Sequence, residues 1–169
     1  MPRHLATIAD SIDRLIAAVG RAVMWLALAV VLLQFAVVVL RYAFGLGSIW
    51  LSESVLYAHA ALFMLAAAWT LQANGHVRVD VFYADASPRA KALVDLLGAL
   101  LLLLPFMAVI AWFASLPYVA RSWAILERSR EASGLPLVYL LKTLIPLFAL
   151  LMALAGIAQA IRAALVLRS

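Results

Sequence analysis

The sequence contains no cysteine and few charged residues, and each scarcity excludes whole classes of protein. Without cysteine, the chain cannot form a disulfide, a thiolate metal site, an iron–sulfur cluster or a cysteine nucleophile. Of its 169 residues, 12% are charged and 68% are hydrophobic, whereas a soluble domain is about 25% charged and about 45–50% apolar. These values exclude a water-soluble globule, a disordered chain and a fibrous protein, and they indicate a membrane protein.

Charge is absent from four long, apolar stretches, which cover residues 22–40, 54–75, 96–120 and 143–161. Each is long enough to cross a hydrocarbon layer of roughly 30 Å at about 1.5 Å per helical residue. Strands of a membrane barrel would alternate apolar and polar residues over about 10 positions, and these stretches do not. The sequence therefore predicts an all-α membrane protein, with four transmembrane helices in a single domain over residues 1–169.

The residues before the first stretch have a helical pattern of their own. Apolar residues recur there at the spacing of one helix face, namely Leu5, Ile8, Ile12, Leu15, Ile16 and Val19. Asp10, Asp13 and Arg14 lie on other faces. The pattern predicts an N-terminal amphipathic helix that lies on the membrane surface and continues into the first transmembrane helix.

Serine and proline positions predict how the later helices begin and bend. Ser87 followed by Pro88 is typical of a helix start, with serine at the N-cap and proline at the first helical position. Pro105, Pro117 and Pro146 lie inside the third and fourth apolar stretches. They predict bends, which neighbouring helices tolerate within a bilayer.

The positive charges favour one orientation in the membrane. The net charge is +5, with 13 Lys and Arg against 8 Asp and Glu, and we interpret this excess as an orientation signal and not as nucleic-acid binding. With the N-terminus inside, the cytoplasmic set is Arg3, Arg14, Arg21, Arg78, Arg89, Lys91, Arg162 and Arg168, and the outer set is Arg41, Arg121, Arg128, Arg130 and Lys142. The bias predicts that both termini are cytoplasmic.

The apolar stretches offer few polar side chains apart from Gln34, His59 and some hydroxyls. A membrane enzyme or autonomous carrier places ionisable groups at this depth, so we expect neither activity from the chain alone. His59 and His76 are 17 residues apart, about 25 Å along a helix, which is too far to ligate one haem. We therefore interpret His59 as a hydrogen-bonded contact between helices, and Gln34 in the same way.

The connections carry the remaining candidate residues. Trp50 and Glu53 follow Arg41 and Tyr42 across a short glycine-containing turn. This group is either an aromatic belt with charges at headgroup level or an Arg41–Glu53 ion pair that fixes the turn, and the two interpretations are compatible.

Two further segments are candidate docking surfaces. Arg78 and Asp80 belong to an alternating polar and apolar stretch, which is either a solvated loop or a surface for a partner. The connection from Arg121 to Lys142 is long for so small a bundle, and long ordered loops are often functional. Lys142, at the start of the last helix, is expected to extend to the interface.

These residues together resemble a known family. The segments are Arg41-Tyr42-Ala43-Phe44, Trp50-Leu51-Ser52-Glu53, Gly75-His76-Val77-Arg78-Val79-Asp80, and Gly134-Leu135-Pro136 followed by Tyr139 and Pro146. In their order around four apolar stretches they resemble the small permease subunit of tripartite ATP-independent periplasmic (TRAP) transporters, the DctQ-like family. The resemblance covers nearly the whole chain.

The resemblance implies a function that the spacing alone does not. It implies a non-catalytic, cofactor-free subunit of the bacterial inner membrane, whose partners are a large multispanning permease and a periplasmic binding protein. The complex would import an organic acid by ion-coupled transport, with the small subunit as scaffold. By analogy, the Arg121–Lys142 connection would face the binding protein, and the Trp50 and Glu53 region would support the outer surface. The alternative is a membrane-anchor subunit of a respiratory or redox complex, which requires a haem or quinone site.

Overall fold

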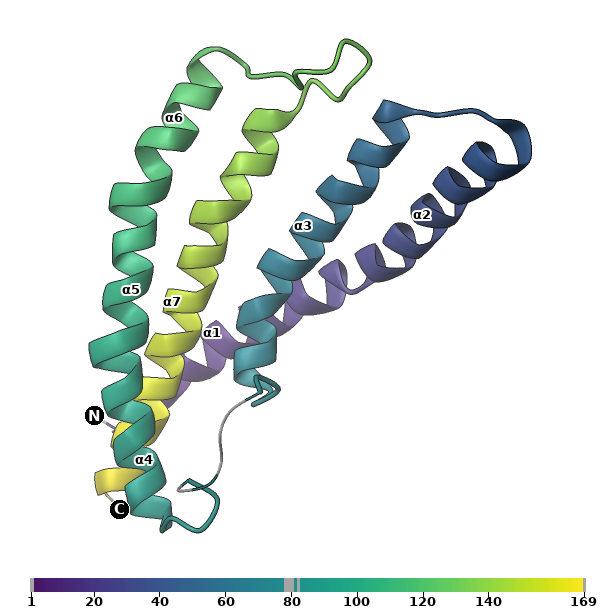
Figure 1. Cartoon of the computed structure of the whole chain (residues 1–169). Coiled ribbons are helices and arrows are strands. Elements are labelled where there is room, and N and C mark those ends of the chain that lie inside the picture. Colours follow the sequence, from purple (N-terminus) through teal and green to yellow (C-terminus); the bar gives the residue numbers. More distant parts are fainter. Residues whose placement is uncertain (1, 78–80, 82, 169) are drawn as a thin grey trace.

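The computed structural model describes residues 2–77, 81 and 83–168, and all regular structure in these residues is helical (Figure 1). In chain order the elements are α1 (Pro2–Val23), α2 (Trp25–Phe44), α3 (Ile49–Gln72), α4 (Pro88–Leu97), the π-helical turn η1 (Gly98–Leu103), α5 (Leu104–Val109), the π-helical turn η2 (Ile110–Ser115), α6 (Leu116–Ala124) and α7 (Val138–Arg168). Four helical stretches are long and apolar enough to cross a membrane. The predicted all-α fold, with four such helices and a helix at the N-terminus, is confirmed.

Both chain termini lie toward one end of the bundle, which we call the terminal end, and two loops lie at the other, which we call the distal end (Figure 1). The distal loops are residues 45–48, between α2 and α3, and residues 125–137, between α6 and α7. The helices extend past the charge-free stretches at several points, because a helix continues beyond the hydrocarbon layer into the headgroup region.

α7 is the central helix of the bundle. It packs against α1, α3 and every segment from α4 to α6, whereas the described contacts of α2 are with α3 and α1. Its buried positions are mostly alanine, and Gly156 allows close approach, since a Cβ there would lie 2.8 Å from Leu103 Cδ2. Small residues suit this position because tight van der Waals packing, and not the hydrophobic effect, holds helices together in lipid.

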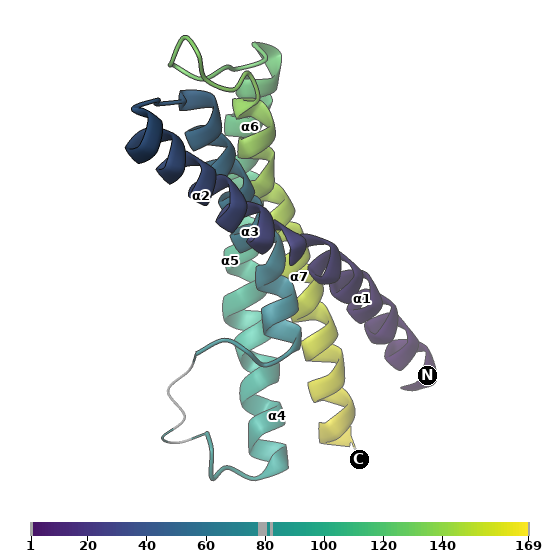
Figure 2. The same cartoon turned by 90° about the vertical axis from the view of Figure 1, so that its right-hand side faces the viewer.

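α1 packs across the bundle at the terminal end (Figure 2). Ala9, Ile16 and Val23 are buried at a spacing of seven residues, which is one helix face. Gly20 is also on α1, and a Cβ there would lie 2.3 Å from Trp69 Cδ2 of α3. The amphipathic helix predicted from the sequence is present, and it runs through a turn at Met24 directly into α2. Its position on the membrane surface stays a prediction.

The two proline-containing points of the third membrane-crossing stretch are preceded by π-helical turns. Pro105 follows η1 and Pro117 follows η2, each near the start of the next α-helical segment. Proline lacks an N–H and clashes with the carbonyl four residues earlier, and a wider turn relieves that clash. The predicted start of this stretch is confirmed, because the Ser87 hydroxyl accepts a hydrogen bond from the Ala90 N–H at 3.3 Å.

Candidate functional site: the distal loop cluster

The long 125–137 loop is fastened to α3 through one carboxylate. Glu53, on the second turn of α3, accepts hydrogen bonds from the Ser129 hydroxyl and from the backbone N–H of Leu135. The loop is also closed on itself, since the Ser129 N–H donates to the Leu135 carbonyl at 3.1 Å. Glu53 is half-buried and Leu135 is buried. The Glu53 carboxylate therefore joins α3 to two loop residues, Ser129 and Leu135, which follow it by 76 and 82 residues in the sequence.

Gly134 is required by this close approach. A Cβ at Gly134 would lie 2.3 Å from the Ser129 hydroxyl oxygen and 2.8 Å from Glu53 Oε1. Both distances are shorter than a Cβ tolerates, so any larger residue would separate the loop from the carboxylate. The Gly134-Leu135-Pro136 segment thus has a structural explanation in the first two residues, whereas Pro136 is exposed.

A second charged group joins the same loop to α7. Lys142 forms an ion pair with Glu127, and its ammonium also lies 3.9 Å from the centroid of the Tyr118 ring. The Ser122 hydroxyl donates to Glu127 at 2.7 Å. The hydrogen bonds from Lys142 and then Ser122 hold the pKa of the Glu127 carboxyl below its usual range. Lys142 is therefore held by Glu127 and the Tyr118 ring at the end of the bundle, and its extension to the membrane interface stays a prediction.

Aromatic packing completes the cluster at the α6–α7 junction. The Trp123 indole N–H donates to the Thr143 hydroxyl at 2.9 Å, and the Trp123 and Tyr139 rings meet edge to face with centroids 4.7 Å apart. We define the distal cluster as Glu53, Tyr118, Ser122, Trp123, Glu127, Ser129, Leu135, Tyr139, Lys142 and Thr143. Its charged groups are held by one ion pair and by hydrogen bonds from neutral donors, and the arrangement fixes the loop to α3 and α7.

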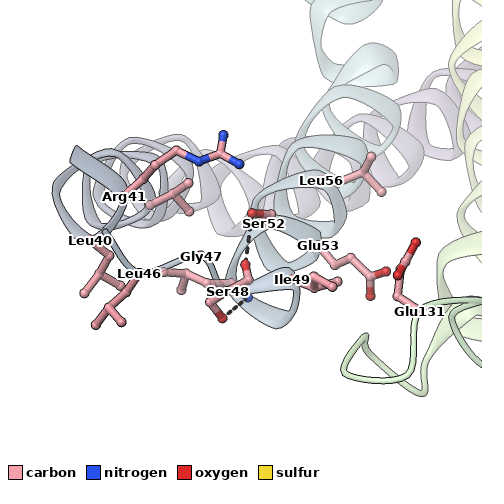
Figure 3. A pocket seen from close by; sticks show the side chains of 12 residues that line it. Leu40, Arg41, Leu46, Gly47, Ser48, Ile49, Ser52, Glu53, Leu56 and Glu131 are labelled. Atoms are coloured by element: carbon pink, nitrogen blue, oxygen red, sulfur yellow. Dashed lines mark hydrogen bonds between the residues drawn. The ribbon is translucent and has the colours of Figure 1, made fainter. Parts of the chain in front are cut away.

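A cavity of about 570 Å³ opens beside the cluster, between α2 and α3 (Figure 3). Arg41, Ser52, Leu56 and Glu131 are among its lining residues, and Glu53 forms part of the wall. The Arg41–Glu53 ion pair considered from the sequence is wrong: among the described residues Arg41 has no ion pair, and Glu53 points toward the loop.

A profile of the family described as "Tripartite ATP-independent periplasmic transporters, DctQ component" matches residues 30–166. The chain belongs to the DctQ family. This DctQ protein is the small membrane subunit of a TRAP transporter, as the resemblance implied, and a multi-pass protein of the inner membrane. The match begins inside α2 and includes the whole distal cluster, with α1 before it. Comparison with curated proteins and with solved structures found no match.

Other predicted residues of this DctQ protein lie apart from the distal cluster. Tyr42 and Trp50 are exposed beside the α2–α3 turn, where an aromatic belt stays a prediction. His76 lies next to the Ala67 carbonyl, with Nε2 and the oxygen 3.2 Å apart. Arg78 and Asp80 lie outside the described residues.

His59 and Gln34 are the two polar residues for which the sequence predicts a contact between helices. Both are exposed on this DctQ subunit, and neither has a hydrogen-bond partner within residues 2–77, 81 and 83–168. They therefore join no helices within the described chain, and a hydrogen-bonded contact with a helix of another subunit stays a prediction.

Sequence reasoning missed a polar junction at the terminal end of the DctQ subunit. Arg162 of α7 pairs with both Asp10 and Asp13 of α1, and the Gln72 side-chain amide donates to the Asp13 carbonyl at 3.1 Å. Arg162 is 152 and 149 positions from the two aspartates in the sequence, so only the packing of α1 on α7 brings them together. The acidic residues on one side of the amphipathic helix were the available signal.

Proposed function

We propose that this DctQ subunit is a non-catalytic scaffold. It packs beside the large permease subunit of its TRAP transporter and fixes that subunit in the bilayer, while the complex takes up an organic acid or related solute from a periplasmic binding protein by ion coupling. Membership of the family supports a place in such a transporter. The scaffold role rests on the distribution of charge along the chain.

The observation that carries the proposal is the position of the ionisable groups. Residues 22–40, 54–75, 96–120 and 143–161 contain no Asp, Glu, Lys or Arg. Among the described residues, ion pairs form at the two ends of the bundle. Glu127 is paired at the distal end, and Arg162 is paired at the terminal end. Carriers bind ions and charged substrates near the middle of the bilayer, with ionisable or broken-helix sites there. A subunit without such groups supports a moving neighbour and does not carry the cargo.

The distal cluster supports a second part of the proposal, a preformed surface for the binding protein. The loop is held to α3 and α7 before any partner arrives, and a preorganised loop loses less conformational entropy on binding than a free one. The proposal requires that the distal end faces the periplasm, which agrees with the distribution of Lys and Arg.

Orientation has a direct test, because the native sequence lacks cysteine. Ser133→Cys places a thiol on the exposed distal loop, and Arg89→Cys places one on the exposed start of α4. In intact spheroplasts a membrane-impermeant maleimide should label the first and not the second, and lysis should make both reactive. Labelling of Arg89→Cys alone in intact spheroplasts would reverse the orientation.

The scaffold role is tested by purification and transport. A tag on this chain should recover the large permease subunit encoded with it, and proteoliposomes should accumulate substrate only when both subunits and the binding protein are present. Vesicles that contain this chain alone should show no flux. Solute accumulation in those vesicles would refute the scaffold role, and so would uptake by the large subunit at full rate without this chain.

A further inference from the structure

Gln34 of α2 and His59 of α3 are exposed polar side chains in the membrane-crossing helices, and they have no hydrogen-bond partner within the described chain. Lipid tails offer no hydrogen-bond partner, and a polar group left unsatisfied in hydrocarbon is costly. Their exposure in the monomer therefore indicates a partner that supplies hydrogen bonds.

The two side chains lie on the same face of the α2–α3 hairpin. Arg41 of α2 and Ser52 of α3 line one cavity between the helices (Figure 3). Gln34 is seven residues before Arg41, and His59 is seven residues after Ser52. Seven residues are almost two helical turns, so each polar residue lies on the same face as the cavity residue above it.

The exposed residues of α3 form a seam for another helix. After Ile49 and Trp50 at the start of the helix, they are Ser52, Leu56, His59 and Phe63, and these four follow the 4-3-4 spacing of a helix-packing stripe. Other sides of α3 are occupied by α1, α2 and α7. We define the hairpin face as Gln34, Arg41, Ser52, Leu56, His59 and Phe63.

The exposed face of η1, α5 and η2 is apolar, in contrast to the hairpin face with its polar residues. Its exposed residues include Leu102, Phe106, Val109 and Phe113, all of them apolar. Phe113 is 75% exposed and Phe63 is 70% exposed, so the two faces differ in polarity and not in accessibility. The apolar face is suited to lipid, and the hairpin face is not.

We propose that the hairpin face is where a transmembrane helix of the large permease subunit docks, with hydrogen-bonding side chains opposite Gln34 and His59. At the distal mouth of the same groove, Arg41 and the Glu131 carboxylate have no ion pair among the described residues. They fit a partner segment that carries charges of both signs. The proposal rests on the proposed function, because the partner is the subunit that the scaffold supports.

Photo-crosslinking in the assembled complex tests the surface. A benzoylphenylalanine at Phe63 replaces one exposed aromatic residue by another, and the same replacement at Phe113 is the matched control. After irradiation in membranes, the Phe63 probe should give a product containing this chain and the large subunit, and the Phe113 probe should not. A product between two copies of this chain, no protein product at Phe63, or equal products at both positions would each overturn the proposal.

Substitution of the polar pair gives an independent measurement. Gln34→Leu and His59→Leu should each lower the amount of large subunit retained after purification by about threefold to tenfold, the range for hydrogen bonds between membrane helices. His59→Gln should retain most of it, and Leu102→Ala on the apolar face should retain all of it. Full retention with the Gln34→Leu/His59→Leu double substitution would refute the docking surface while leaving the scaffold role intact. Failure of the unsubstituted chain to recover any large subunit would instead refute the proposed function.

Discussion

Removal of the Glu53 carboxylate should release the 125–137 loop from α3. In Glu53→Ala, the Leu135 N–H and the Ser129 hydroxyl both lose their acceptor. In Glu53→Gln, the side chain keeps its shape and one acceptor oxygen, but it loses its charge. The two substitutions therefore separate the contribution of the negative charge from that of the hydrogen-bonding geometry.

The size of the effect follows from the two hydrogen bonds. A hydrogen bond to a charged group contributes about 1.5–3 kcal/mol, and a neutral one about 0.5–1.5 kcal/mol. Because Glu53 is only half-buried, water replaces part of the loss, and we expect about 3 kcal/mol for Glu53→Ala. Since 1.4 kcal/mol is a factor of ten, the open form of the loop should become about 100-fold more populated. For Glu53→Gln the expected increase is about tenfold.

Hydrogen exchange at Leu135 measures this opening directly, because its N–H is bound by the carboxylate itself. The exchange rate of the peptide containing Leu135 should rise by the same factor as the open population. Glu131→Ala is the matched control, since that carboxylate borders the same groove but accepts no hydrogen bond among the described residues. Unchanged exchange at Leu135 in a folded Glu53→Ala protein would refute the reasoning.

Three further predictions follow from packing and charge. Gly20→Ala forces a Cβ against Trp69 and should destabilise the bundle by about 1–3 kcal/mol, whereas Gly98→Ala, with open space around it, should not lower the thermal midpoint in detergent. The interactions that lower the pKa of the Glu127 carboxyl stabilise the folded state at pH values above the ordinary carboxyl pKa. That contribution should be lost as pH falls from about 5 through the lowered pKa, and Glu127→Gln should flatten the pH dependence of the thermal midpoint. Arg162→Ala should loosen α1 at a cost of about 1 kcal/mol, seen as faster proteolysis near the N-terminus.

The helices could be predicted from the sequence because the cause is local. A run of about 20 residues without charge leaves the chain few options in a bilayer, and serine before proline marks a helix start wherever the rest of the chain lies. The predictions at Ser87 and for the N-terminal amphipathic pattern succeeded for this reason.

The partners of the polar residues could not be predicted, because they depend on tertiary packing. Arg41 and Glu53 are close in sequence, which suggested an ion pair. Glu53 follows Ser52 by one residue, about 100° around the helix, so when Ser52 lines the α2–α3 groove Glu53 turns toward the loop. Its actual partners, Ser129 and Leu135, lie 76 and 82 residues away. The position of Lys142 beside Tyr118 likewise depends on how α6 and α7 meet.

The π-helical turns before Pro105 and Pro117 also affect how related sequences compare with this one. A turn of this kind closes over five residues where an α turn closes over four. A relative with an ordinary residue in place of either proline has no clash to relieve, so its third span can do without the additional residue. Alignments of such relatives should then show single-residue gaps within 98–103 or 110–115. In this chain, replacement of the proline by an ordinary residue, combined with deletion of one residue in the π-helical turn before it, should preserve the register of every side chain beyond that point.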